Sequence, residues 1–185
     1  MIAPANACFY AAAMDPIVVR DAVPDDLPVI VDLLNAWIVS RTYEYREVPH
    51  TVEARGPWMH EQRQRGFPIL VAENGGGTVI GFATYDDFRD SVGRPGYRFT
   101  VEHTIQISES AWGQGIGRLL MQRLLERASS AGAHVMVGAI DSSNTDSLAF
   151  HSRLGFVETA RMPEVGWKHG RWCDLVFMQR TVDAP

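Results

Sequence analysis

A glycine-rich turn and one acidic residue are the parts of this sequence best suited to chemistry. The turn, Gly113-Gln114-Gly115-Ile116-Gly117, follows a segment of alternating apolar and polar residues and precedes one with helical spacing. Glycines let a backbone approach a ligand closely, and the first N–H groups of a helix have no partner within the helix. The helix dipole favours an anion at the same place. The sequence therefore predicts a phosphate-binding turn directly after a strand that carries Glu102.

Two common nucleotide-binding motifs do not match this turn. A P-loop requires Gly-Lys-Ser/Thr where the helix begins, and here Gly117 is followed by Arg118 and Leu119. The dinucleotide fingerprint requires a third glycine three residues later, where Leu120 stands. Taken alone, the turn is also compatible with a flexible connection that binds nothing.

The elements that position the turn are predicted from hydrophobic periodicity. The strand before it has one largely apolar face and one polar face. The apolar face holds Tyr97, Phe99, Val101, Ile105 and Ile107, and the polar face holds Arg98, Thr100, Glu102, Thr104 and Gln106. The helix after it has a buried stripe at helical spacing. This stripe consists of Ile116, Leu120, Met121, Leu124, Leu125 and Ala128.

The rest of the chain alternates between strands and helices. Strands are expected at residues 17–20, 67–73, 78–86, 97–107, 134–140, 156–159 and 172–179, and helices at about 26–38, 51–65, 116–128 and 144–154. The first helix is expected to bury Val29, Ile30, Leu33, Leu34, Trp37 and Ile38. This order of elements predicts an α/β sandwich with a mixed sheet.

Length and composition narrow the classes of protein. At 185 residues the chain is expected to form one domain, residues 16–182, preceded by a disordered tail, residues 1–15, that lacks the features of a signal peptide. The net charge of −5 argues against a nucleic-acid partner, and no apolar run is long enough for a membrane span. Cys8 and Cys173 give neither a disulfide framework nor metal-ligand spacing, so we expect no metal and a cytoplasmic location.

The glycine turn resembles the coenzyme A pyrophosphate loop of the GNAT N-acetyltransferases, whose pattern is Arg/Gln-x-x-Gly-x-Gly/Ala. Gly115 and Gly117 match the two later positions, whereas Trp112 departs from the first. This departure removes a polar side chain but leaves the backbone N–H groups, which do most of the binding. The resemblance implies acetyl-CoA as cofactor and a central mixed, mostly antiparallel sheet with helices on both faces.

A second motif supports the same resemblance. The run Asn144-x-x-Ser147-x-x-x-His151-x-x-x-Gly155-Phe156 is similar to the segment after the fifth strand of these enzymes. The resemblance implies that Asn144 contacts the pantetheine or phosphate arm and that His151 protonates the leaving thiolate. Asn144 could instead be a plain helix N-cap, and His151 a histidine on a half-buried helix face.

The chain further resembles the phosphinothricin and methionine sulfone/sulfoximine acetyltransferase subgroup over about residues 16–180. Three stretches carry this resemblance: residues 99–104, His151, and residues 165–172. The terminal element matches at Lys168, Gly170, Arg171, Trp172 and Asp174. The resemblance implies a homodimer in which Glu102 and His151 are catalytic.

These motifs define the predicted site. Cofactor-binding residues are expected to be Ile105, Gln106, Ile107, Trp112, Gly113, Gln114, Gly115, Ile116, Gly117, Arg118, Asn144 and Ser147. A small-molecule amine acceptor is expected to contact Tyr43, Tyr45, Arg94, Arg98 and Thr100, with Arg98 preferred for an acceptor carboxylate because guanidinium groups bind carboxylates well.

The predicted reaction is direct attack of an amine on the thioester, because no Ser-His-Asp or Cys-His arrangement offers a covalent route. Glu102 is the candidate base, although it could also be a structural carboxylate paired with Arg98. A small bulge at residues 104–107 is expected to free an N–H for the oxyanion. Alternative acceptors are a polyamine, an aminoglycoside or a protein N-terminus, and a non-catalytic acyl-CoA-binding module is a further alternative.

Overall fold

Seven strands form one sheet in the computed structural model, which describes residues 16–182. The strands are β1 (Val18–Asp21), β2 (Ile69–Glu73), β3 (Val79–Asp87), β4 (Thr100–Ile107), β5 (Val135–Asp141), β6 (Val157–Lys168) and β7 (Arg171–Thr181). The helices are α1 (Leu27–Ser40), α2 (Val52–Gln64), α3 (Ile116–Ser130) and α4 (Thr145–Arg153). The strand order is β1-β2-β3-β4-β5-β7-β6. The predicted tail, residues 1–15, lies outside the described residues.

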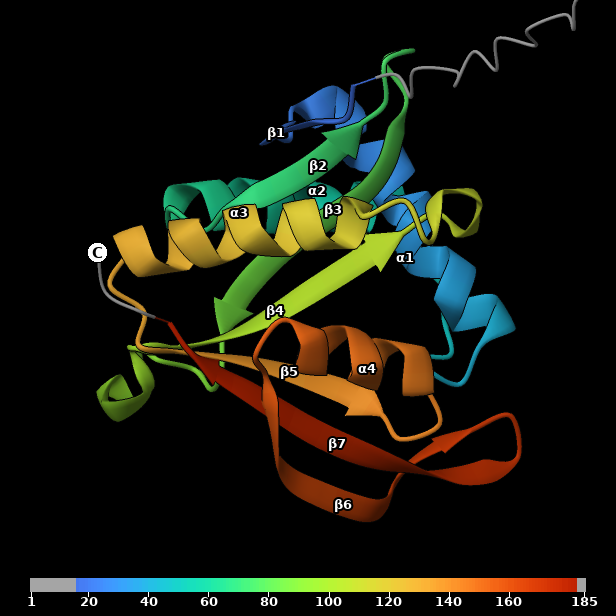
Figure 1. Cartoon of the computed structure of the whole chain (residues 1–185), viewed down its shortest axis with the longest axis vertical. Helices are drawn as coiled ribbons and strands as arrows, with labels where there is room; N and C mark the ends of the chain where they lie inside the picture. The colour runs from blue at the N-terminus through green and yellow to red at the C-terminus, as the bar shows by residue number, and fades with distance from the viewer. Residues whose placement is uncertain (1–15, 183–185) are drawn as a thin grey trace, which may run out of the picture.

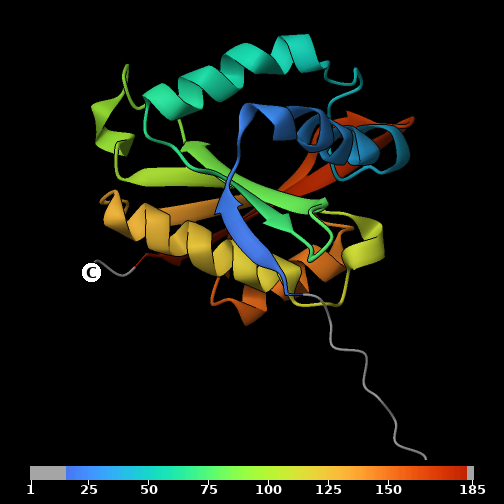
Figure 2. The same ribbon diagram turned by 90° about the horizontal axis from the view of Figure 1, so that it is seen from above.

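The sheet lies between two layers of helices. Helices α3 and α4 cover one face, and α1 and α2 cover the other (Figures 1 and 2). Among the described strands, only β4 and β5 run parallel, and every other neighbouring pair is antiparallel. The predicted fold, an α/β sandwich with a mixed, mostly antiparallel sheet, is confirmed. Among residues 16–182, none of the helices could cross a membrane.

The two helical layers enclose two apolar cores. The α3 stripe is buried at every predicted position, and Leu120, Met121 and Leu124 are fully inaccessible to solvent. The α1 stripe was predicted less well, because Val29 is exposed whereas Leu27 and Val31 are buried. The stripe follows the helical period from Leu27, where α1 begins, and that period places Val29 on the outer face.

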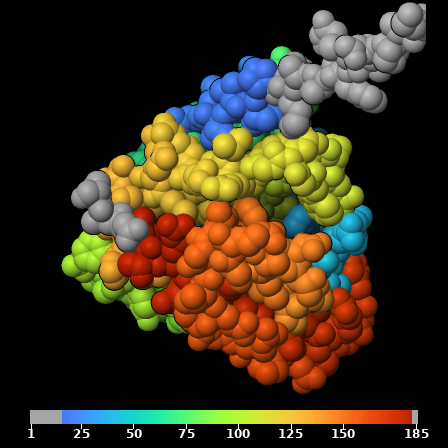
Figure 3. Space-filling view, in the orientation of Figure 1, coloured from blue at the N-terminus to red at the C-terminus, as the bar shows by residue number. Residues whose placement is uncertain are grey.

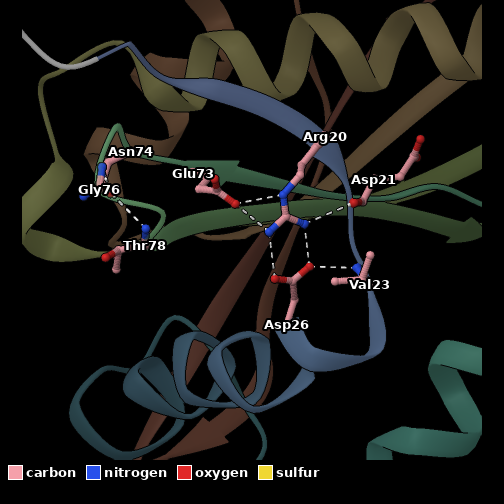
Figure 4. Close-up of polar contacts among 8 residues, drawn as sticks. All are labelled: Arg20, Asp21, Val23, Asp26, Glu73, Asn74, Gly76 and Thr78. Atoms are coloured by element: carbon pink, nitrogen blue, oxygen red, sulfur yellow. Dashed lines mark hydrogen bonds and ion pairs between the residues drawn. The ribbon is translucent and has the colours of Figure 1, made fainter.

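An ion-pair network joins the neighbouring strands β1 and β2 to the start of α1 (Figure 4). The Arg20 guanidinium donates to Asp26 at 2.7 and 3.0 Å and to Glu73 at 2.9 and 2.7 Å. Asp26 also accepts the Val23 N–H at 2.7 Å. The pKa of Asp26 is lowered mainly by its hydrogen bonds with Arg20. Asp26 therefore stands at the N-cap position of α1, but its carboxylate holds the preceding turn rather than the helix N–H groups.

The central parallel pair separates soon after it begins. Thr100–Glu102 of β4 pair with Val135–Val137 of β5, and the pairing then ends. β4 continues along β3 as far as Ile107, while β5 continues along β7 as far as Asp141. The two strands therefore diverge (Figure 1). We call the point of separation, after Glu102 on β4 and Val137 on β5, the fork.

Two predicted strand boundaries are wrong. Residues 97–99 precede β4 because Pro95–Tyr97 form a 3-10 turn, in which proline fixes the backbone. The strand predicted at 156–159 instead runs to Lys168 as β6. Two register shifts against β7 interrupt its alternation and hid its length. The turn between β6 and β7 consists of His169 and Gly170, both with positive φ, as a two-residue hairpin turn requires.

The buried stripe of α3 gives a direct test of the packing. Leu124→Ala should lower the free energy of unfolding by about 2–5 kcal/mol, because it removes a fully buried side chain and leaves a cavity. Leu119→Ala is the matched control on the same helix, since Leu119 is 43% exposed, and should change stability by less than about 0.5 kcal/mol. Chemical denaturation measures both. Equal losses in the two variants would contradict the observed orientation of α3.

Candidate functional site

A cavity of about 580 Å³ opens between the N-terminal end of α3 and helix α4. Figure 3 shows this opening beside the loop that follows α1. Of the residues predicted to bind the cofactor, those that line it are Ile105, Ile107, Trp112, Gly113, Gly115, Ile116, Gly117, Arg118, Asn144 and Ser147. Gln106 and Gln114 do not. Gln106 is buried on the other face of β4, and the Gln114 amide donates to the Ser110 carbonyl at 3.1 Å.

The glycine turn has the geometry of an anion site. Gly113 and Gly115 have φ of +74° and +80°, which L side chains rarely adopt. A Cβ on Gly117 would lie 3.1 Å from the Phe150 ring. Gly115 is the N-cap of α3, and no side chain caps that helix within residues 16–182. Its first N–H groups are therefore available to a phosphate in the cavity.

Trp112, which departs from the family pattern, starts a row of aromatic rings along the cavity. Its Nε1–H donates to the Ile107 carbonyl at 3.0 Å. Its ring meets Trp37 of α1 edge-on at 6.4 Å, and Trp37 meets Tyr43 at 5.5 Å. All three rings line the cavity. Trp112 thus connects the glycine turn to the loop after α1, and it leaves the backbone of the turn free.

The fork supplies backbone donors without a bulge. Ser108 N–H donates to Ile80 O, and Phe88 N–H donates to Thr100 O, so even-numbered residues of β4 bond to β3. The N–H groups of Ile105 and Ile107 therefore point toward β5, beyond the end of its pairing. The predicted bulge is wrong, because the β3–β4 register has no shift. Strand separation frees the donors instead.

Asn144 is a helix N-cap that also faces the cavity, and its contact with the cofactor stays a prediction. Its side-chain oxygen accepts the Ser147 N–H at 3.1 Å and caps α4. It also lines the cavity. Asp141, at the end of β5, holds the preceding turn by accepting the Ser143 N–H at 2.9 Å and the Ser143 hydroxyl. The turn after β5 is thereby fixed against the cavity wall.

Glu102 is the last residue of β4 that pairs with β5, so it lies at the fork. Its cross-strand partner on β3 is Asp86, which accepts a hydrogen bond from Gln62 of α2. Directly paired residues share one face of a sheet, so the Glu102 carboxylate faces α1 and α2. Burial, and next the charge of Asp86, raise its pKa. Among residues 16–182 it has no ion-pair partner, since the Arg98 guanidinium donates to Pro95 O at 2.7 Å.

His151 lies on the opposite face from Glu102 and is buried against a second histidine. Its Nδ1 is 2.7 Å from Ser147 O, and its Nε2 is 3.2 Å from Nε2 of His103. Burial lowers the pKa of His151, and burial together with His151 lowers the pKa of His103 to about 3. His103 was missed in the sequence, although it is the one polar residue on the apolar face of β4 and could have been noticed for that reason.

The predicted acceptor residues are not gathered in one place. Tyr43 lines the cavity, whereas the Tyr45 hydroxyl donates to Asp141 at 3.0 Å and to Asp174 O at 3.2 Å. Arg94 and Arg98 are exposed in the segment before β4, and Thr100 is half-buried at its first position. The acceptor contacts of these residues remain predictions.

Lys168 fixes the loop that carries the two tyrosines. Its side chain is buried, and its ammonium donates to Ile38 O at 2.8 Å and to Arg46 O. Ile38 belongs to the last turn of α1, where free carbonyls and the helix dipole favour a cation. Gly166 also faces the loop, and a Cβ there would lie 2.5 Å from the Tyr45 ring. The end of β6 therefore holds residues 38–46 in place.

Comparison with known proteins agrees with this geometry. The family model described as Acetyltransferase (GNAT) family matches residues 31–156, more than half of the chain. The L-methionine sulfoximine/L-methionine sulfone acetyltransferase of Pseudomonas aeruginosa is 42% identical over 165 residues, which are 89% of this chain and 94% of that protein. The phosphinothricin N-acetyltransferase of Alcaligenes faecalis is 36% identical over 90% of this chain and 82% of its own length.

A solved structure shows the same fold with the donor bound. The GNAT superfamily phosphinothricin acetyltransferase of Sinorhizobium meliloti, in complex with acetyl-CoA, has a TM-score of 0.85 at 35% identity. The match covers 90% of this chain and 88% of that one. This chain belongs to the GNAT acetyltransferase family, and acetyl-CoA is its acetyl donor.

Substitutions at two glycines with the same backbone conformation distinguish an effect on cofactor binding from an effect of backbone strain. Gly115→Ala and Gly132→Ala both place a side chain at φ +80°, and each should cost about 1–2 kcal/mol of stability. Only Gly115 lies in the cavity, so only Gly115→Ala should also raise the Kd for coenzyme A, by tenfold or more. Calorimetric titration with coenzyme A measures the difference. Equal Kd values for the two variants would show that the turn does not bind the cofactor.

Proposed function

We propose that this chain acetylates the α-amino group of a small amino-acid analogue of the phosphinothricin, methionine sulfone or methionine sulfoximine type. The position of Glu102 carries the proposal. Its carboxylate lies at the fork, half-buried and without an ion-pair partner among the described residues, on the face covered by α1 and α2. The names of the relatives from Pseudomonas aeruginosa and Alcaligenes faecalis support this class of acceptor.

The side chains and backbone N–H groups around the fork are suited to direct attack of the amine on the thioester within a ternary complex. Acetyl-CoA supplies an activated thioester. The α-ammonium group of the acceptor must lose one proton before it attacks, and Glu102 is positioned to accept that proton directly or through water. The N–H groups of Ile105 and Ile107, which have no strand partner on the β5 side, are suited to hold the carbonyl oxygen as it gains charge. The departing sulfur must gain a proton, and His151, on the opposite face of the sheet from Glu102, is the group that we propose to supply it.

The charges of the acceptor indicate which side chains are suited to bind it. An amino-acid analogue carries a carboxylate and a polar head group, and arginine binds both well. Tyr43, Tyr45, Arg94, Arg98 and Thr100 are the residues we propose for these contacts. The support is their position on the loop after α1 and on the segment leading into β4.

We also propose that the protein works as a homodimer in the cytoplasm. The β6–β7 hairpin lies at the edge of the sheet and exposes Trp167, Trp172 and Val165 at 48%, 60% and 47%. An exposed apolar edge strand is a natural surface for a second copy of the same chain. Analytical sedimentation of the wild type and of Trp167→Ser tests this proposal: the wild type should sediment as a dimer, and the variant should shift toward the monomer.

The acceptor class is tested by release of free thiol from acetyl-CoA. The amines are methionine sulfone, methionine sulfoximine, phosphinothricin, methionine, spermidine and an aminoglycoside. Turnover on the first three is expected, and Glu102→Gln should reduce kcat by about 100-fold or more, because the base is lost, while coenzyme A still binds. Turnover only on spermidine or the aminoglycoside would overturn the acceptor. Coenzyme A binding with no turnover on any amine would favour a non-catalytic acyl-CoA-binding module.

The charge of Asp86 should be visible in the pH dependence of the reaction. Glu102 must be ionised to act as a base, so kcat/KM should rise with pH through its raised pKa. Asp86→Asn removes a negative neighbour, lowers that pKa, and should move the acidic limb to lower pH. Asp87→Asn is the control, because Asp86 and Asp87 both pair with Arg65 but Asp87 stands opposite Val101 rather than Glu102. A limb unmoved in Asp86→Asn, or moved equally in both variants, would contradict the assignment.

A further inference from the structure

A second cavity, of about 420 Å³, lies at the C-terminal end of α3. Arg127 and Ser130 of α3 line it, together with Tyr85 of β3 and Arg63 from the end of α2. Among the described residues, it shares no lining residue with the first cavity, which opens at the N-terminal end of the same helix. The two cavities therefore lie at opposite ends of α3 (Figure 1), and the second is separate from the proposed site of acetyl transfer.

Tyr85 brings an unused hydrogen-bond donor to the second cavity. The residue is 1% exposed, and its ring packs edge-on against Phe67 at 5.3 Å. Within residues 16–182 its hydroxyl has no hydrogen-bond partner, whereas a buried tyrosine hydroxyl usually finds one. Burial raises the pKa of Tyr85 and the charge of Arg127 opposes that rise, so the guanidinium lies near the hydroxyl. The hydroxyl is thus available to an acceptor that enters beside Arg127.

The two arginines bring further donors and most of the charge. Arg127 pairs with Asp21 through one terminal nitrogen, but its Nε is buried and has no partner in the described part of the chain. Arg63 donates through one terminal nitrogen to Ala22 O at 2.7 Å. Each guanidinium has five N–H donors, so several remain unused. Two guanidinium groups and one carboxylate, that of Asp21, leave the lining with one excess positive charge.

These groups favour a ligand that carries a single negative charge. A carboxylate presents two oxygens in one plane, which suits guanidinium donors, and its one charge balances the excess on the lining. Inorganic phosphate carries more than one negative charge at neutral pH and would exceed that balance. Part of the wall is apolar, so a short hydrocarbon group can pack beside the carboxylate. The apolar wall consists of Ala22, Phe67, Pro68 and Ile69.

We propose that this second cavity binds a small organic monocarboxylate. The carboxylate accepts hydrogen bonds from the Tyr85 hydroxyl and from the Arg127 Nε–H, which are the two unpartnered donors. The exposed Arg63 adds positive charge at the opening, and the hydrocarbon part of the ligand packs on the apolar wall. This inference goes beyond the proposed function and does not depend on the identity of the amine or on turnover.

Amide NMR of the full-length protein tests the site with butyrate as the probe. Coenzyme A is present at saturation, so that butyrate cannot occupy the first cavity. Butyrate should shift the amide signals of Gly66, Tyr85 and Ala131 saturably. Butyramide, a neutral counterpart of the same size, should bind at least about tenfold more weakly because it lacks the charge. Equal binding of the two probes, tighter binding of inorganic phosphate, or no saturable shift at these residues would overturn the proposal.

Two substitutions each remove one of the proposed donors. Tyr85→Phe removes only the hydroxyl, Arg127→Gln removes the guanidinium, and each should raise the Kd for butyrate about tenfold. Arg123→Gln is the matched control, because Arg123 also forms an ion pair on α3, with Glu126, but lies outside the cavity. It should leave the Kd unchanged. An unchanged Kd in the first two variants, or an equal rise in all three, would contradict the assignment of these donors.

Thermal melts of the free protein test whether the Tyr85 hydroxyl is unused. Tyr85→Phe should not lower the melting temperature, because it removes a buried polar group that makes no hydrogen bond and keeps the ring in place. A clear loss of thermal stability would show that the hydroxyl already has a partner, and would overturn its role as a donor to the ligand. The same melts confirm that Arg127→Gln and Arg123→Gln are folded.

Discussion

β4 and β5 pair over Thr100–Glu102 and Val135–Val137 and then separate, and the site depends on that separation. Each strand has a second neighbour, β3 or β7, so neither loses its place in the sheet when the two part. The gap exposes the N–H groups of β4 that an unbroken sheet would have used. It also gives α3 and α4 the space between them in which the cavity opens. A thioester in that gap would meet backbone donors that need no reorganisation.

Because successive side chains on a strand point to opposite faces, β4 presents different chemistry on the two sides of the fork. Glu102 faces α1 and α2, with a pKa raised by burial and by Asp86. His103 faces α4, where it contacts His151 in an environment that disfavours charge. In the proposed function, Glu102 on one side takes a proton from the acceptor before attack, and His151 on the other side gives a proton to the leaving group. The sheet lies between these two groups, so each can act in its own surroundings.

Much of this arrangement could be predicted from the sequence, because local signals were strong. The α3 stripe, the glycine turn and the cap at Asn144 each follow from residue type and spacing, and the structure places the last two around one cavity. The fork could not be predicted, since strand separation depends on which neighbours each strand has. The length of β6 was hidden by its register shifts, and the partnership of His103 with His151 links residues 48 positions apart. Lys168 matched a motif, but its function in holding residues 38–46 required the fold.

A crystal structure with coenzyme A and methionine sulfone bound would test the central claim most directly. The account predicts that the sulfur lies in the fork between Ile105 and Gly138, with the acceptor nitrogen about 3 Å from the Glu102 carboxylate or one water away from it. It further predicts that the pyrophosphate lies on the N-terminal end of α3. A pantetheine arm that runs outside the fork, or an acceptor nitrogen on the α4 side and out of reach of Glu102, would contradict the account.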